Sequence, residues 1–516
     1  MSILFDPRDA RCKSPFGAVP CGAAVTFCFR PERGAAVTRC ELLAHGEFAD
    51  QWTTVELSPA QEDGHVVYRG VFTAPDDVEL IWYHFRLSWA DGGTSCYGKN
   101  GLCAWDAVTP WQLTVYDDTH KTPEWFGRGV TYQIFPDRFR RAKKRDVAGL
   151  VGPRTLHEHW DELPEYRPNA QGEITCSDFF GGDLQGITEK LDYLASLGVT
   201  TLYLCPIFEA STNHRYDTAC YERIDPLLGD EADFRALCAE AKKRGIHVML
   251  DGVFNHTGRK SVYFNADGFY DDLGAAQGEQ SPYYRWYNFH DEYDAWWGIK
   301  NLPAVNELEK SYVDYIIEGD NSIIKRWLRA GASGWRLDVA DELPDEFIAK
   351  IRAAMDEEDP DAYLLGEVWE DGTTKIAYSK RRRYLLGRET NGLMNYPFRT
   401  ALMAYLLGGG AEYFRDSMEA LRENYPAPAF YGAMNFLSTH DTPRLLTILG
   451  LTSPAPQTRD ERAVYRLNDS DLARGMSLLK LAALILYTFP GSPMLYYGDE
   501  AGMQGFEDPF NRGTYP

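Results

Sequence analysis

The chain carries, at residues 184–204, the stretch LQGITEKLDYLASLGVTTLYL, and this stretch decides the fold. From Ile187 to Leu197 its apolar side chains recur every three to four residues, which places them on one face of a helix. Gly198 stands where a helix commonly ends in a left-handed residue. Residues 199–204 form a continuous apolar run, which predicts a buried strand. The stretch is therefore predicted to be one helix–strand unit, with the helix over 184–197.

The same alternation of strands and helices continues along the chain. Phe234, Leu237 and Ala241 mark a second amphipathic helix, which Gly245 ends. Apolar runs predict eight strands, at residues 130–135, 199–204, 246–250, 334–337, 363–366, 393–395, 433–437 and 494–497. Eight strands that alternate with helices are typical of an α/β fold of the (β/α)8 barrel type. The third strand precedes a long excursion, residues 253–315, which predicts an inserted subdomain.

The N-terminal part of the chain has a different pattern. Turn-forming Gly, Pro and Asp residues separate its apolar runs, which lie at residues 23–29, 37–44, 66–72, 80–87 and 112–116. This spacing predicts an antiparallel β-sandwich over residues 1–116. A polar segment follows, so residues 117–128 are predicted to be a linker and residues 129–516 the barrel.

The composition excludes several classes of protein. The chain of 516 residues has 53 basic and 76 acidic side chains, and its net charge of −23 argues against nucleic acid or an anionic membrane as a partner. Its ten cysteines form no C-x-x-C pair, which argues against a structural zinc site. The N-terminus has no apolar signal segment, and the apolar run at 481–489 is too short to span a bilayer. We expect a cytoplasmic protein with free thiols.

Polar residues gather at the ends of the predicted strands, which is where a barrel of this type carries its functional groups. They are Asp251, Asn255 and His256 after the third strand, Arg336 and Asp338 at the fourth, Glu367 and Trp369 at the fifth, and His440 and Asp441 at the seventh. Any one of these acids could be a structural cap. Four strands that deliver carboxylates to one face instead predict a reactive site.

Paired carboxylates beside a cation suit the cleavage of a glycosidic bond. One carboxyl must give a proton to the leaving oxygen, and another must be ionised to attack the anomeric carbon. Arg336 lies two residues from Asp338, so both side chains share a face and the guanidinium should keep Asp338 ionised. Glu367, with apolar neighbours and two anions nearby, suits the acid, and Asp441 would stabilise the transition state.

Four of these segments resemble the signature regions of the α-amylase family of retaining α-glucosidases, glycoside hydrolase family 13. They are DGVFNH at 251–256, GWRLDVA at 334–340, LGEVW at 365–369 and FLSTHD at 436–441, in the family's order. Four more segments resemble the neopullulanase, cyclomaltodextrinase and maltogenic amylase subgroup. They are FFGGDLQGI at 179–187, NHRYDT at 213–218, LPAVN at 302–306 and MNYPF at 394–398.

The resemblance implies a role for individual residues. Asp338 would be the nucleophile that forms a β-glucosyl-enzyme, Glu367 the acid and then the base, and Asp441 the transition-state stabiliser. Substrate contacts would come from Tyr216, His256, Arg336, Trp369, His440 and Arg444, the last of which could equally form a plain ion pair. Sugar contact is also expected of the aromatic residues in the excursion, Tyr283, Trp286, Trp296 and Trp297.

The resemblance also bears on cofactors. Members of the subgroup often hold Ca²⁺ with several Asn and Asp residues in the loop after the first strand. Here residues 137–146 contain six basic side chains, which would repel a hard cation and leave it short of oxygen ligands. Asp183 and Asn255 remain as candidate metal ligands. We expect that no cofactor is required, and calcium stays open as the alternative.

The sequence thus predicts a retaining, endo-acting hydrolase of α-1,4 links in maltooligosaccharides, cyclomaltodextrins, pullulan or starch. Two alternatives stay open: a transglycosylase of the same family, and a non-catalytic glucan-binding member. Asp341 stands where the subgroup usually has Asn, and this extra carboxylate could change the balance of hydrolysis and transfer. The resemblance implies a homodimer built through the sandwich. Relatives usually have an eighth barrel helix and a C-terminal β-domain, so this barrel is expected to be incomplete at its C-terminus, with that domain absent.

Overall fold

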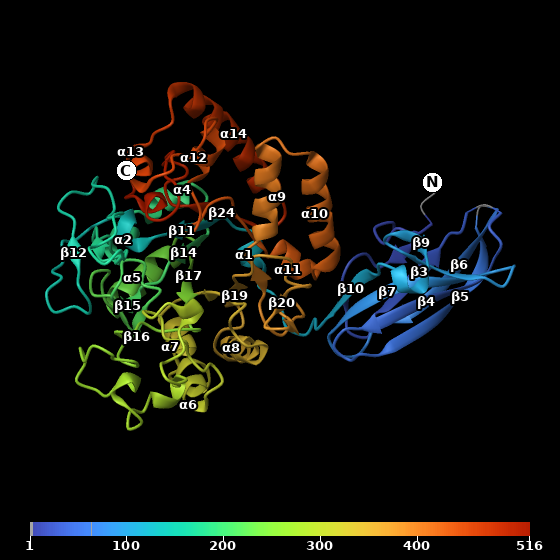
Figure 1. Cartoon of the computed structure of the whole chain (residues 1–516), viewed down its shortest axis with the longest axis horizontal. Helices are drawn as coiled ribbons and strands as arrows, with labels where there is room; N and C mark the ends of the chain where they lie inside the picture. The colour runs from blue at the N-terminus through green and yellow to red at the C-terminus, as the bar shows by residue number, and fades with distance from the viewer. Residues whose placement is uncertain (1–3, 33, 63) are drawn as a thin grey trace. The chain divides into compact units, whose positions relative to one another are not determined.

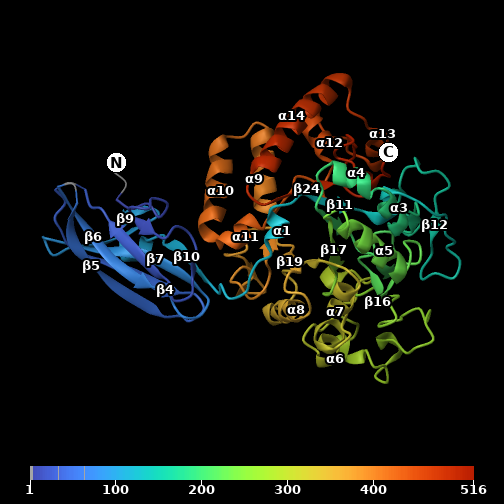
Figure 2. The same ribbon diagram turned by 180° about the vertical axis from the view of Figure 1, so that it is seen from behind.

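The structure is a computed structural model of the chain, and it describes residues 4–32, 34–62 and 64–516. The chain divides into two compact units. The first comprises Met1–Lys121, Asp371–Glu389 and Arg415–Phe430, and the second Thr122–Glu370, Thr390–Phe414 and Tyr431–Pro516. Figures 1 and 2 show the elements of each unit from opposite sides.

The second unit is built on eight parallel strands that pair in chain order (Figure 1). They are β11 (Thr131–Ile134), β14 (Thr201–Leu204), β17 (His247–Gly252), β18 (Gly334–Leu337), β19 (Tyr363–Gly366), β22 (Gly392–Leu393), β23 (Met434–Asn435) and β24 (Ser492–Tyr496). β24 pairs with β11, and a parallel bridge between Met394 and Met434 joins the two remaining edges, so the sheet closes. The predicted (β/α)8 barrel is confirmed, and each predicted strand overlaps one of these eight.

Helices alternate with these strands along the chain (Figures 1 and 2). They are α1 (Glu124–Gly127), α2 (Pro136–Phe139), α3 (Leu184–Glu189), α4 (Leu191–Ser196), α5 (Glu231–Lys242), α6 (Lys310–Val313), α7 (Ile323–Arg329), α8 (Asp345–Glu358), α9 (Tyr396–Leu406), α10 (Ala411–Asn424), α11 (Ala427–Tyr431), α12 (Leu445–Gly450), α13 (Arg459–Val464) and α14 (Asp469–Thr488). Within the described ranges, none of the helices has both the length and the apolarity needed to cross a membrane.

The stretch that predicts the fold differs from expectation in one detail. The helix expected over 184–197 is two helices, α3 and α4, because the backbone at Lys190 (φ −98°, ψ 1°) leaves α-helical geometry. The N–H of Lys190 bonds to the carbonyl of Ile187, three residues back, and this tighter turn ends α3. Gly198 has a φ of +79° and ends α4 as the sequence predicts.

A buried apolar cluster forms the core of the barrel unit. It contains Phe126, Tyr203, Met249, Tyr363, Leu365, Met394, Tyr396, Met434, Phe436 and Met494. Large aromatic and thioether side chains fill the space between the strands. Polar groups with a chemical role therefore belong to the carboxyl ends of the strands, above this core.

The connection after β17 is held by aromatic contacts and short turns. It contains the 3₁₀ turns η2 (Ala275–Gln277), η3 (Tyr284–Trp286) and η4 (Trp296–Gly298) and, at its end, the π-helical turn η5 (Asp314–Glu318) that follows α6. The ring of Trp286 lies 5.2 Å from that of Tyr263, and its Nε1 donates to Ser311 Oγ. Trp286 is only 2% exposed, so the expectation that it contacts sugar is wrong. Trp297, by contrast, is 80% exposed.

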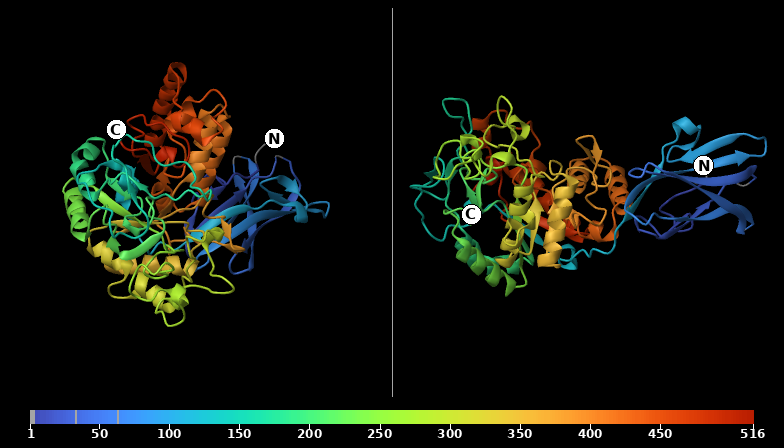
Figure 3. Two further views of the ribbon diagram at one scale, coloured as in Figure 1. Left: turned by 60° about the vertical axis from the view of Figure 1, so that its left-hand side comes forward. Right: turned by 90° about the horizontal axis from the view of Figure 1, so that it is seen from below.

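The first unit contains two sheets that are continuous through one shared strand and are antiparallel apart from the parallel β2–β10 pair; its strands, coloured blue, lie in two layers in Figure 3. The long strand β5 (Trp52–Glu62) pairs with β4 in one sheet and with β6 in the other. The other strands are β1 (Lys13–Ser14), β2 (Val19–Pro20), β3 (Ala24–Phe29), β4 (Val37–Gly46), β6 (His65–Thr73), β7 (Glu79–Trp89), β8 (Thr94–Gly98), β9 (Gly101–Cys103) and β10 (Trp111–Tyr116), with a 3₁₀ turn η1 (Trp105–Ala107). All five predicted strands are present.

The sequence does not reveal β5, and the reason is its exposure. Of its eleven residues only Leu57 is buried, so the strand lacks the continuous apolar run that marks its neighbours. The core between the sheets is rich in aromatic rings, and Phe5 lies within 6.3 Å of Phe27, Tyr83, Phe85 and Trp111 by ring centroid. All ten cysteines of the chain are free thiols.

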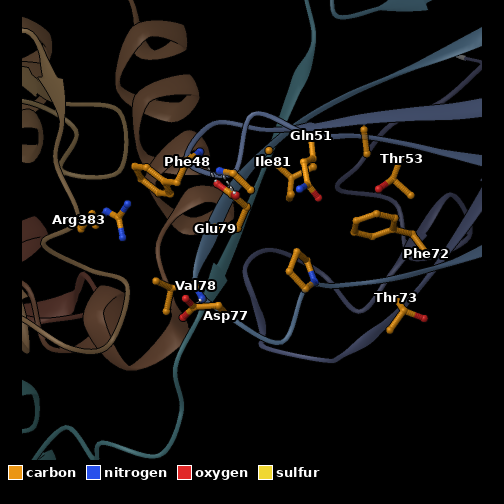
Figure 4. Close-up of a pocket in the computed structure, with 14 residues that line it drawn as sticks. Phe48, Gln51, Thr53, Phe72, Thr73, Asp77, Val78, Glu79, Ile81 and Arg383 are labelled. Atoms are coloured by element: carbon orange, nitrogen blue, oxygen red, sulfur yellow. Dashed lines mark hydrogen bonds between the residues drawn. The ribbon is translucent and has the colours of Figure 1, made fainter.

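A cavity of about 310 Å³ lies at the β4–β5 hairpin of this unit (Figure 4). Its buried carboxylate, Glu79, accepts hydrogen bonds from the backbone N–H groups of Phe48 (2.8 Å) and Ala49 (2.9 Å). The Arg383 guanidinium lies 4.1 Å from the centroid of the Phe48 ring. The polar groups of this cavity thus fix the hairpin within its own unit.

Gly334, the first residue of β18, offers a test of the barrel geometry. A Cβ there would lie 2.2 Å from the carbonyl oxygen of Tyr363, a backbone atom that cannot move without breaking the β18–β19 pairing. We expect Gly334→Ala to lower the melting temperature by more than about 8 °C or to prevent folding.

The matched control is Gly245→Ala, at a site where a Cβ meets nothing within 4 Å and only the φ of +70° costs energy. That variant should lose about 2–4 °C in circular dichroism melts. Equal melting temperatures for the two variants would contradict the tight contact of β18 with β19.

Candidate active site

One guanidinium joins three carboxylates at the carboxyl ends of three neighbouring strands. Arg336 Nη1 lies 2.8 Å from Asp251 Oδ1 and 2.7 Å from Asp338 Oδ1, and its Nη2 lies 2.8 Å from Glu367 Oε2. The register of β17 and β18 sets Asp251 beside Arg336, so both side chains share one face of the sheet. Asp338 and Glu367 directly follow β18 and β19. The strand pairing thus builds the cluster.

The cluster carries more negative than positive charge in a buried place. The Arg336 side chain is fully buried, and Asp338 is only 7% exposed. Burial, together with the charges of Glu367 and Asp251, raises the pKa of Asp338 well above its usual range, and Arg336 opposes that rise. Burial also raises the pKa of Asp251. The expected ion pair of Arg336 with Asp338 is present, but the surroundings favour a bound proton in this cluster.

The Glu367 carboxyl is held from several directions. Its Oε2 accepts the backbone N–H of Val339 at 2.8 Å, and its Oε1 accepts Trp369 Nε1–H at 3.1 Å and the Tyr396 hydroxyl at 3.3 Å. Val339 has a φ of +41°, a conformation that strains a β-branched residue. This backbone conformation directs the Val339 N–H toward Glu367. Val339 directly follows Asp338 in the chain. The Trp369 ring stacks on Tyr396 at 4.4 Å and is 55% exposed.

A hydrogen-bond chain crosses the site from β11 to β17. Gln133 Nε2 lies 2.8 Å from His440 Nδ1, His440 Nε2 lies 2.5 Å from the Tyr216 hydroxyl, and that hydroxyl donates to Asp251 at 3.0 Å. Burial lowers the pKa of His440 well below its usual range, so the imidazole is neutral. The Gln133 amide then donates to Nδ1, which leaves the proton of His440 on Nε2.

Asp441 is the most open of the acidic side chains, with 32% of its side chain exposed. His440 Nε2 lies 3.3 Å from its Oδ2, and Arg512 Nη2 lies 3.7 Å from its Oδ1. Arg512 also donates from Nε to the carbonyl of His440 at 3.0 Å. The Asn511 amide donates to the carbonyls of His440 and Thr442 at 2.7 and 2.9 Å. The sequence does not indicate Asn511 and Arg512 as site residues, because they follow the last strand and carry no periodic signal.

His256 lies beside this group with a free ring nitrogen. Its ring stacks on Trp296 with centroids 5.1 Å apart, and Asn255 Nδ2 lies 3.2 Å from its Nδ1. Nε2 is buried and has no hydrogen-bond partner among the residues that the structure describes. Burial lowers the pKa of His256 to about 4, so its imidazole is neutral at pH 7. Neither histidine can therefore be the strong acid of this site.

The partners of Arg444 are not the residues that were predicted to bind substrate together with it. Its guanidinium is fully buried, donates to the carbonyls of Asn511 and Tyr497, and pairs with Asp499 at 3.2 Å. It also lies 4.1 Å from the centroid of the Tyr496 ring. These contacts tie the segment after β23 to the segment after β24. The structure thus brings together every predicted site residue apart from Arg444 and Asp183.

The residues considered for calcium do not fit a metal. The Asp183 carboxylate caps α3 through the N–H of Gly186 and also accepts the N–H groups of Ala142 and Lys143. Asn255 turns its amide to His256. Throughout residues 4–32, 34–62 and 64–516, no three His, Cys, Asp or Glu side chains are close enough to hold an ion. We therefore assign no step to a metal.

The fold and the site define a class: a closed (β/α)8 barrel with a carboxylate cluster at its carboxyl-terminal face. The family model described as "Alpha amylase, catalytic domain" matches residues 133–515. The chain therefore belongs to the alpha-amylase family.

Relatives agree with this assignment. The chain is 37% identical to an amylopullulanase of Thermoanaerobacter thermohydrosulfuricus over all of its own length and 37% of the relative's. It is 32% identical to neopullulanase 2 of Thermoactinomyces vulgaris over 92% of this chain and 74% of that one. The solved type III pullulan hydrolase of Thermococcus kodakarensis superposes with a TM-score of 0.66 at 28% identity, over 99% of this chain and 84% of that one. The chain thus spans little more than a third of the amylopullulanase's length.

The raised pKa of Asp338 predicts how stability depends on pH. Because its folded pKa lies above the unfolded value near 4, this group lowers stability as the pH rises through the folded pKa. Asp338→Asn keeps the neutral form, so its melting temperature should exceed that of the parent by about 2 °C or more at pH 8. The two proteins should converge near pH 4.

Differential scanning calorimetry between pH 4 and 8 measures this difference, and the exposed Asp361→Asn is the matched control, with no gain expected. A gain for Asp338→Asn that is constant across the pH range would contradict a raised pKa at this position.

Proposed function

We propose that this protein is a retaining, endo-acting hydrolase of α-1,4-glucosidic bonds. The observation that carries the proposal is the single guanidinium of Arg336 that holds Asp338 and Glu367 beside each other. Retaining glycosidases need their two carboxyls about 5–5.5 Å apart, whereas inverting ones leave about 6.5–9.5 Å for a water. Two carboxylates that share one guanidinium are compatible with the shorter separation.

In the proposed mechanism Asp338 reacts in its ionised form, the form that pairs with Arg336, and its carboxylate attacks the anomeric carbon while Glu367, in its protonated form, gives its proton to the glycosidic oxygen. The C1–O bond breaks, the leaving chain departs with that proton, and a β-glucosyl ester forms on Asp338. Glu367, now ionised, takes a proton from water, and the resulting hydroxide equivalent attacks C1 and frees Asp338. Product and substrate then share the α configuration.

The remaining residues of the site suit substrate binding. His256 Nε2 lacks a partner and His440 is neutral, so both imidazoles can hydrogen-bond sugar hydroxyls. Tyr216 offers a ring face next to His440, with the rings 5.3 Å apart. Asp441 has the open carboxylate that can interact with the developing positive charge. Trp369, half exposed beside the acid, suits contact with the leaving or accepting sugar.

The names of the relatives support a proposal for the substrate class. Their names include cyclomaltodextrinase, neopullulanase and intracellular maltogenic amylase, which supports an α-glucan substrate. We propose maltooligosaccharides, cyclomaltodextrins, pullulan or starch as substrates, and a cytoplasmic homodimer as the working form. Incubation with each glucan and identification of the products tests the substrate, and longer chains formed at high substrate concentration would favour the transglycosylase instead.

The roles of the two carboxylates can be separated with azide. In Asp338→Ala, azide should attack an α-glucosyl fluoride directly and give the β-glucosyl azide, because the nucleophile is missing. In Glu367→Ala, the glucosyl-enzyme should still form and azide should give the α-glucosyl azide. Both variants should lose about 10⁴-fold or more in kcat on maltooligosaccharides. Nuclear magnetic resonance identifies the anomers, and the same anomer from both variants would contradict the assignment.

The oligomeric state has its own test. Light scattering at micromolar concentration should give about twice the chain mass of 58.5 kDa. A monomer across the concentration range of the activity assay would refute the dimer and leave the catalytic proposal intact.

A further inference from the structure

A fully buried amide, that of Gln133 on β11, lies against the hydrogen-bond chain that crosses the site. Its Nε2 lies 2.8 Å from His440 Nδ1 and 3.4 Å from Cys205 Sγ. Its Oε1 is buried and meets no hydrogen-bond partner within the described part of the chain. A buried polar side chain with an unpaired atom is costly for stability alone, which points to a role in the site that it contacts.

The contacts of the amide decide which of its ends faces His440. In the observed orientation both N–H groups have an acceptor, one at the imidazole and one at the Cys205 thiol, and a single oxygen is unpaired. The reverse orientation would turn both N–H groups of Gln133 toward the place where Oε1 has no partner. Two buried donors without acceptors cost more free energy than one buried acceptor without a donor, so the amide donates to Nδ1.

The other side of the imidazole agrees with this direction. His440 Nε2 lies 2.5 Å from the Tyr216 hydroxyl and 3.3 Å from Asp441 Oδ2. An ionised carboxylate can only accept a hydrogen bond, so Asp441 also favours a proton on Nε2. Burial, and then the charges of Arg512 and Arg336, hold the pKa of His440 well below its usual range, so the ring carries this one proton.

All donors in the chain then point the same way. His440 Nε2–H donates to the Tyr216 oxygen, and the Tyr216 hydroxyl donates to Asp251 Oδ2 at 3.0 Å. Arg336 pairs with the other oxygen of Asp251. A hydrogen-bond chain of one direction therefore leads from Gln133 to the guanidinium of the reactive cluster. Reversal of its first donor would turn the later ones, because the neutral imidazole and the hydroxyl each have a single proton to give.

We propose that Gln133 is a positioning residue that holds His440 as the Nε2–H tautomer and so fixes the direction of this chain. The proposal rests on the proposed function in one respect, namely that the Nε2–H group is the donor that His440 offers to a sugar hydroxyl. A donor that is held in place before substrate binds needs no reorganisation during the reaction. Its contribution should therefore appear in kcat more than in KM.

The test is ¹⁵N nuclear magnetic resonance of the full chain labelled in histidine, with the His440 signals assigned by their loss in His440→Asn. At pH 7 the parent should carry a proton on Nε2 of His440 and none on Nδ1. Gln133→Glu should place a proton on Nδ1, because a carboxylate accepts where the amide donates. In the same variant kcat on maltooligosaccharides should fall at least about 30-fold, with KM changed by less than about 3-fold.

Gln133→Met is the second variant, and it gives an answer even if Gln133→Glu does not fold, since it brings no charge to the core. It leaves Nδ1 without a donor, so both tautomers should be populated and kcat should fall at least about 5-fold. The matched control is Gln112→Glu, at a buried strand amide that donates to Thr114 and Thr373 in the first unit. Hydroxyls donate as readily as they accept, so this variant should keep the His440 tautomer and the kcat of the parent.

A proton on Nδ1 in the parent would overturn the proposal, as would a tautomer that neither Gln133 variant changes, or a kcat that does not follow the proton. An equal loss of kcat in Gln112→Glu would also overturn it, because any buried charge would then have the same effect. If Gln133→Glu moves the proton but the parent hydrolyses no glucan, the positioning of His440 stands and the proposed function fails. If the parent hydrolyses glucan and the tautomer ignores Gln133, the proposed function stands and the positioning fails.

Discussion

The structure depends on a buried guanidinium that is shared by acids from three adjacent strands. Arg336 lies near the carboxyl end of β18. It pairs with Asp251 of the neighbouring strand β17, with Glu367, which directly follows β19, and with Asp338, which directly follows β18. A buried cation is tolerated only when its partners satisfy it, and buried acids only when a cation stands nearby. Each strand therefore needs its neighbours in this register. The strand order of the barrel and the charge pairing in the cluster therefore depend on each other.

Reactivity follows from the imbalance in that arrangement. Three acids share one cation in a place that water barely reaches, so the cluster favours a bound proton, and the pKa of Asp338 rises through burial. The neighbouring histidines cannot supply that proton, because burial keeps both of them neutral. The acid of the site must then be a carboxyl. The strained backbone of Val339, which presents its N–H to Glu367, is a local cost of holding that carboxyl in position.

The sequence predicts most of the barrel because its strands are buried on both sides and are therefore continuous apolar runs. The same logic places Asp251, Arg336, Asp338, Glu367 and Asp441 at one face, since strand ends meet there. Prediction from the sequence fails for elements whose exposure removes the apolar run, and for residues that lie far along the chain from the strand ends that form the site. β5 is almost wholly exposed, so it shows no apolar run. Arginine usually lies at the protein surface, but Arg444 is buried against Tyr496 and Tyr497. Asn511 and Arg512 are brought to the site only by the folding of the chain. The Trp286 ring packs against other aromatic residues and does not face solvent.

The central proposal is that Asp338 becomes covalently glucosylated while Arg336 holds it in place and Glu367 supplies the proton. The most direct measurement is peptide mass spectrometry after the protein is incubated with 5-fluoro-α-glucosyl fluoride, whose second fluorine slows hydrolysis of the ester. The account predicts one fluoroglucosyl adduct per chain, on the peptide that contains Asp338, and none in Asp338→Asn. An adduct on Glu367 or Asp441, or turnover of the reagent without any adduct and with inverted product, would contradict it.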